Sequence, residues 1–163
     1  MRKKNIVLYT FIIVALTMVI TPLVVAKTDT RLNGDVFIEL QKEFIQFPRC
    51  TDPCPCSFVG TVSGDIEGVL YIHLVDAWFP APGVEHFIEY WYIETGDDYI
   101  QGENKGKWTM SNFNWVANGE VTDASDDYGH LIGCKWQYRG TTNDPFIDDP
   151  VVGYGKFHIT HNK

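Results

Sequence analysis

Short runs rich in β-branched and aromatic residues, separated by turn residues, fill the chain after position 57. They lie at 58–62, 66–79, 86–94, 106–116, 120–122, 130–138 and 154–160. Such runs are typical of β-strands. Ser63-Gly64-Asp65 separates the first two runs, and the turn 95–98 follows the third, so adjacent strands are expected to form hairpins. The pattern predicts an antiparallel all-β domain.

The segment 35–46 fits two kinds of element. Val36, Phe37, Leu40 and Phe44 approximate helical spacing, but the same residues also suit a strand. We favour a strand, because every run downstream is β. With this segment the chain has about eight strands, which predicts a single antiparallel up-and-down β-barrel. The alternative is a β-sandwich or jelly roll.

Glycines interrupt several of the runs, at Gly60, Gly68, Gly133 and Gly155. Glycine inside a strand indicates a bulge or a sharp bend. A sheet needs such bends to close into a barrel, so the glycines favour the barrel over the sandwich.

The glycine-containing segments 60–68, 119–122 and 152–157 resemble the strands of calycin-type barrels. These include the lipocalins and the allene oxide cyclase and dirigent-like barrels. The resemblance covers residues 58–160 and implies a barrel with an apolar interior cavity. It transfers no functional residue, and the Gly-x-Trp motif of the lipocalins does not occur near the first strand.

The start of the chain has the layout of a secretory signal. A basic cluster at 2–4 precedes an apolar run at 6–20, and Pro22 and a Val24-x-Ala26 ending follow. We expect cleavage after Ala26 and a secreted protein.

An uncleaved anchor is the alternative to cleavage. Residues 6–26 are long enough to cross a bilayer, which takes about 20 residues, and would hold the domain on the outer face of the membrane. The expected parts are therefore a signal peptide or anchor at 1–26, an N-terminal segment with a Cys/Pro-rich loop at 27–57, and the barrel core at 58–163.

The net charge restricts the partners. The chain has 13 basic and 21 acidic residues, a net charge of −8. Removal of residues 1–26 would take away three basic residues and no acidic one, which lowers the net charge to about −11. Such a surface disfavours nucleic acid and anionic membrane, so membrane contact is expected only through residues 6–26. It suits cations, cationic partners or neutral ligands, and it also promotes solubility.

Four cysteines in an exported chain predict two disulfides. Cys50, Cys54 and Cys56 lie in a proline-containing loop, and Cys134 lies far downstream in an expected strand. Cys54 and Cys56 are too close to pair easily across Pro55, so we expect Cys134 to pair with one of the three. A metal site built from thiolates is the alternative, but the Cys-x3-Cys-x-Cys spacing differs from the paired Cys-x2-Cys of zinc sites.

No catalytic residue is predicted, because the chain has no nucleophile elbow, phosphate loop, His-Glu-x-x-His or dinucleotide motif. We expect no cofactor except weakly bound calcium, with the acidic loop residues Asp144, Asp148 and Asp149 as ligands. Asp123, Asp126 and Asp127 are the alternative set.

The tryptophans suggest a binding function. Trp91, Trp108 and Trp136 are candidates to line the interior and hold a small, largely apolar ligand, and core packing is the alternative role that such residues have more often. A carbohydrate-binding sandwich that uses exposed aromatic rings is the second hypothesis. An exported cyclase or isomerase-like enzyme on a calycin barrel is the third. The expected partner is an apolar ligand or a glycan, and the oligomeric state is not predicted.

Overall fold

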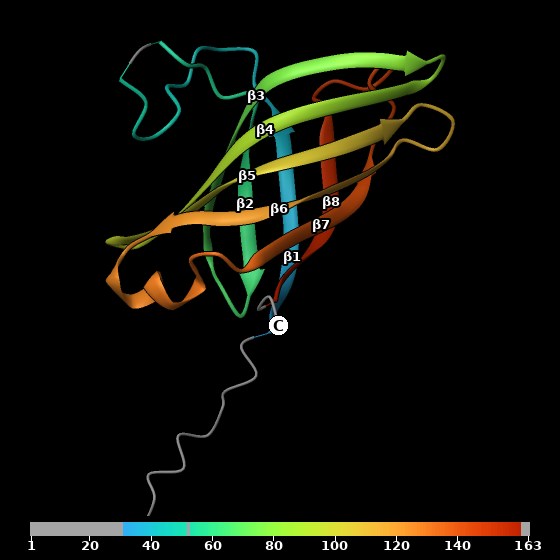
Figure 1. The fold of residues 1–163 in the computed structure, drawn as a ribbon. Coiled ribbons are helices and arrows are strands. Elements are labelled where there is room, and N and C mark those ends of the chain that lie inside the picture. The colour runs from blue at the N-terminus through green and yellow to red at the C-terminus, as the bar shows by residue number, and fades with distance from the viewer. Residues whose placement is uncertain (1–30, 52, 161–163) are drawn as a thin grey trace, which may run out of the picture.

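Eight antiparallel strands form a closed up-and-down barrel in the computed structural model, which describes residues 31–51 and 53–160 (Figure 1). The strands are β1 (Leu32–Leu40), β2 (Phe58–Gly64), β3 (Gly68–Ala81), β4 (Val84–Thr95), β5 (Asp98–Thr109), β6 (Asn114–Ala124), β7 (Lys135–Thr142) and β8 (Val152–Thr160). Each strand pairs with the next, and β1 pairs with β8 to close the barrel. The barrel prediction is confirmed, and the sandwich alternative is wrong.

The expected signal peptide or anchor at 1–26 lies outside the described residues. Within the described part of the chain, no helix is both long enough and apolar enough to cross a membrane. The helical element there is a short 3₁₀ helix, η1 (Asp126–Leu131), between β6 and β7.

Two of the expected strands differ in the structure. The run 106–116 is not one strand but the hairpin of β5 and β6, in which Trp108 pairs directly with Trp115. The turn forms at Asn112, whose side-chain oxygen accepts a hydrogen bond from the backbone N–H of Asn114 at 3.1 Å. Asparagine favours such turns. The run 130–138 begins in η1, so β7 starts only after Cys134.

The ambiguous segment 35–46 begins as a strand, as favoured. It forms most of β1, which belongs to the barrel although it lies within the expected N-terminal part 27–57. After Leu40 the chain leaves the sheet and packs on the outer face of the wall. There Phe47 and Cys56 are buried in a cluster with Tyr92.

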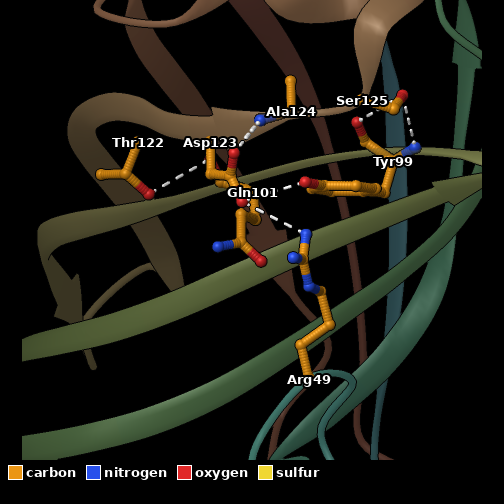
Figure 2. A network of polar contacts seen from close by, with 7 residues as sticks. All are labelled: Arg49, Tyr99, Gln101, Thr122, Asp123, Ala124 and Ser125. Atoms are coloured by element: carbon orange, nitrogen blue, oxygen red, sulfur yellow. Dashed lines mark hydrogen bonds and ion pairs between the residues drawn. The ribbon is translucent and has the colours of Figure 1, made fainter.

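A polar network holds this outer segment to β5 and β6 (Figure 2). The Arg49 guanidinium lies 4.2 Å from the ring centroid of Tyr99 and donates a hydrogen bond to the Asp123 carboxylate at 3.2 Å. The Tyr99 hydroxyl donates to the same carboxylate oxygen at 3.0 Å. All three side chains are partly accessible to water, so the network positions the segment more than it stabilises the fold.

Large aromatic rings fill the barrel interior because glycines face them. A Cβ placed on Gly102 would lie 2.4 Å from the Trp91 ring, and one on Gly155 would lie 2.4 Å from the Trp115 ring. Real carbon atoms do not approach so closely, so only glycine admits these rings. The register shifts of the sheet occur at other positions, near residues 74–76, 78–81 and 101–102. Of the two interpretations of these glycines, a bulge or a sharp bend, the bulge is wrong for Gly60, Gly68 and Gly155, where the register is continuous.

The two ends of the barrel differ. At one end η1 and the β2–β3 turn cover the interior, where Ile66 and Leu131 have 1% and 0% of their surface exposed. At the other end, where β1, β3, β5 and β7 finish, the interior opens into a cavity. The core thus has a closed end and an open end.

Replacement of Gly102 by alanine tests the packing of rings on glycine. The added methyl group would overlap the Trp91 ring and the Glu120 carbonyl oxygen, so we expect Gly102→Ala to lower the unfolding free energy by about 3 kcal/mol. Gly129→Ala is the matched control, because no atom of the described residues, apart from its chain neighbours and the backbone of η1, lies within 4 Å of the position that its added methyl group would take. Urea unfolding measures both. Equal stability of the two variants would contradict this account of the core.

Candidate functional site: a cavity at the open end of the barrel

The cavity at the open end has a volume of about 210 Å³. Its wall comes from β1 to β7 and from the loop that precedes β8. Most of the lining is apolar and includes Ile38, Leu40, Phe58, Leu74, Trp108 and Trp115. Ligand sites usually combine such a lining with a few polar groups.

The polar groups of the lining are Glu85, Glu89, Tyr138 and Thr142. The two glutamates lie on the same face of β4, because residues two and four apart in a strand point to one side. Glu89 is 3% exposed, and Glu85 is half-buried nearer the end of the barrel. The cavity therefore has a buried carboxyl group at its floor and a second one nearer to solvent.

Glu89 is held by donors from two other strands. The Tyr138 hydroxyl on β7 donates a short hydrogen bond to Glu89 Oε1, and the Asn104 amide on β5 donates to the same oxygen at 3.1 Å. Asn104 in turn accepts a hydrogen bond from the Trp91 indole at 3.1 Å. The network runs through the interior from the cavity floor to the aromatic core.

Burial has a strong effect on the acidity of this network. It raises the pKa of Glu89 to about 7, although the hydrogen bonds from Tyr138 and Asn104 favour the ionised form. Burial, and then the neighbouring Glu89 charge, hold the pKa of Tyr138 well above its ordinary value. Burial also raises the pKa of Glu85. Glu89 therefore exchanges its proton near neutral pH, as groups at functional sites often do.

The three predicted tryptophans do not form one site. Trp91 and Trp136 stack on each other, with ring centroids 4.4 Å apart, and each is 1% exposed in the filled part of the barrel. Trp108 lines the cavity, where its indole donates a hydrogen bond to the Thr142 hydroxyl at 3.2 Å. The second tryptophan of the cavity is Trp115, which pairs with Trp108 across the β5–β6 hairpin.

The three aspartates proposed as calcium ligands make hydrogen bonds and an ion pair in and near the β7–β8 loop. Asp144 and Asp148 accept hydrogen bonds from backbone N–H groups of this loop at 2.9 Å. Asp149 forms an ion pair with Lys42. Across residues 31–51 and 53–160, no group of three His, Cys, Asp or Glu side chains is placed to hold a metal ion.

The cysteines form one disulfide in the structure, and it differs from the expected pairing. Cys50 bonds to Cys54, and Cys134 forms a disulfide with none of the three N-terminal cysteines. The barrel wall explains this, because Cys56 is buried in the outer cluster and Cys134 in the interior core. Burial raises the pKa of the Cys56 thiol to about 11, which makes this thiol unreactive.

Sequence reasoning missed Glu89, Asn104 and Tyr138. A signal for Glu89 was present, since it lies two residues before the core residue Trp91 in a strand with period-two alternation. That spacing places a carboxyl group on the inward face. Comparisons with known proteins gave no match to this chain among family models, curated proteins or solved structures.

Glu89 should make the stability of the barrel depend on pH. Its pKa is about 7 in the folded state, against 4.5 as an ordinary carboxyl, so between these values the folded state binds more protons. The contribution of Glu89 to the free energy of unfolding is therefore fully present below pH 4.5 and is lost as the pH rises through 7. We expect Glu89→Gln, which removes this titration, to be more stable than the parent at pH 8 by about 3 kcal/mol.

At pH 4.5 that advantage should be small, because both side chains are then neutral. Urea unfolding of both proteins at pH 4.5 and 8 gives four free energies of unfolding. At each pH the value for the parent is subtracted from that for the variant, which removes the contribution of the other carboxyl groups. A difference between parent and variant that does not change with pH would show that Glu89 keeps an ordinary pKa.

Proposed function

We propose that this protein is an exported barrel of calycin-like architecture that binds a small, largely apolar ligand in the cavity at its open end. The observation that carries the proposal is the cavity itself, a space of about 210 Å³ with a mostly apolar lining at the open end of a closed barrel. Transfer of apolar ligand surface from water into such a space is favourable. The Cys50–Cys54 disulfide supports export to an oxidising compartment.

The size of the cavity limits the ligand. A dry apolar cavity of about 150 Å³ holds one benzene molecule, and pockets for drug-sized ligands begin near 300 Å³. The cavity of about 210 Å³ lies between these values. It suits a single ring with a short side chain, whereas a long-chain lipid would have to extend into solvent. The Trp91–Trp136 stack occupies the interior, so the ligand belongs at the mouth, between Trp108 and Trp115.

Obstruction of the cavity tests the proposal. Propylbenzene should bind at one site with a dissociation constant of about 0.1 mM, an affinity typical of a ligand with nine heavy atoms. Leu74 lines the cavity, so Leu74→Trp should fill it and abolish the binding. Val69→Trp is the control, because Val69 lies on the same strand and is 36% exposed. Isothermal titration calorimetry measures each affinity.

Two results would contradict the proposal. One is the absence of propylbenzene binding to the parent protein, and the other is equal binding by the Leu74→Trp variant. A titration with soluble polysaccharide that shifts the tryptophan emission, while propylbenzene has no effect, would favour carbohydrate binding.

Proton-transfer catalysis is a second candidate function, favoured by the position of Glu89 at the cavity floor. A carboxyl group with a pKa of about 7 can both accept and donate a proton near neutral pH. If the protein is such an enzyme, it should speed the exchange of methyl hydrogens of acetophenone for deuterium in D2O, followed by proton NMR. Glu89→Gln should abolish the acceleration, and a rate equal to that of buffer with the parent protein would remove this candidate.

A further inference from the structure

To a ligand, the cavity offers mainly hydrogen-bond acceptors, because the donors of Tyr138, Thr142 and Trp108 are already in use. The Tyr138 hydroxyl donates to Glu89 Oε1. The Thr142 hydroxyl donates to the Phe113 carbonyl oxygen at 3.4 Å. The Trp108 indole donates to Thr142. The Trp115 indole N–H is buried and has no hydrogen-bond partner among the described residues, and it lies 3.4 Å from the position that a Cβ on Gly153 would take.

The acceptors, in contrast, are not all in use. Both hydrogen bonds to Glu89 reach Oε1, and Oε2 accepts none from the described residues. The Glu85 carboxyl has no hydrogen-bond partner among these residues either. Both carboxyl groups line the cavity, so a ligand that donates hydrogen bonds to these oxygens gains affinity.

The charges of the lining have one sign. Its titratable groups are Glu85 and Glu89 from β4 and Tyr138 from β7, and no lysine, arginine or histidine of the described part of the chain belongs to the lining. The chain as a whole has a net charge of −8, which attracts cations and repels anions. The faces of the cavity aromatics Trp108, Trp115 and Phe87 add a further attraction for a cation.

From these observations we infer that the ligand is a small aromatic or aliphatic amine, whose ammonium group binds between Glu89 and Glu85 while its apolar part lies against the tryptophan rings. The inference rests on the proposed function, because it assigns a chemical class to the ligand of the same cavity. A neutral apolar molecule would leave the two carboxyl groups without partners, and a carboxylate ligand would be repelled by them.

The affinity for an amine should depend on pH through Glu89, since the ion pair needs the ionised carboxylate. The other titratable groups around Glu89 are Tyr138, which stays protonated, and Glu85, which ionises in the same sense. Affinity should therefore rise as the pH rises through 7. Between pH 5.5 and 8 the ionised fraction of Glu89 increases about 30-fold, and the affinity should increase by about tenfold or more.

Four ligands of similar shape separate the contributions: 2-phenylethylamine, propylbenzene, 2-phenylethanol and phenylacetate. Calorimetric titration of the whole protein at pH 5.5 and 8 measures each affinity. At pH 8 we expect the amine to bind at least tenfold more tightly than propylbenzene and phenylacetate to bind most weakly. The amine should also release protons on binding at pH 6.5, detected with two buffers of different ionisation enthalpy.

Variants show which carboxyl group acts. Glu89→Gln should remove the advantage of the amine and its pH dependence but keep propylbenzene binding, and Glu85→Gln should reduce the advantage. Glu103→Gln is the control, because Glu103 carries the same charge on β5 and does not line this cavity. If Glu89→Gln does not fold, the pH dependence of the parent protein and Glu85→Gln still decide the question.

The outcomes separate the two proposals. Equal binding of the amine and propylbenzene at both pH values would overturn the amine inference and leave the apolar-ligand proposal intact. Tighter binding of phenylacetate, or binding of 2-phenylethanol as tight as that of the amine, would also overturn it. Absence of binding by all four ligands would overturn both proposals together.

Discussion

The contact between large aromatic rings and glycines is the constraint on which this barrel depends. The interior of an eight-stranded barrel is only wide enough for side chains or for one small ligand. Rings as large as Trp91 and Trp115 fit there because the neighbouring strands present Gly102, Gly140 and Gly155 to them. The glycines lower the local strand propensity, and the buried rings compensate through apolar surface and dense packing.

The same constraint determines where a ligand can bind. The Trp91–Trp136 stack and Phe157 fill the middle of the barrel, and η1 covers one end. The interior opens into a cavity of about 210 Å³ at the opposite end. There β4 contributes not only a ring, Phe87, but also the carboxyl group of Glu89. The place where the aromatic packing ends is therefore also the place where a titratable group is buried.

The sequence predicted the architecture because alternation of apolar and polar residues, together with turn residues, reports directly on strands. The prediction failed at 106–116, since residues typical of strands lie on both sides of a tight turn that contains only a short polar pair, Ser111 and Asn112. The predicted disulfide to Cys134 failed because sequence spacing does not show on which side of the barrel wall a residue lies. The tryptophans were predicted as a group, but only Trp108 reaches the cavity, since depth along the barrel axis depends on strand register.

The fold does not require a carboxyl group at the position of Glu89. Replacement of its carboxyl group by an amide would keep an oxygen that accepts hydrogen bonds from Tyr138 and Asn104. It would also avoid the free-energy cost of a buried charge. For a pKa of about 7 this cost is about 3 kcal/mol when the pH is above neutral. A barrel with such a dense core gains no stability from this carboxyl group at that pH. Departures from the rules of stable packing concentrate at functional sites. The cost of ionising Glu89 falls when a cation binds beside it, so the same group that weakens the empty barrel would strengthen its complex with an amine.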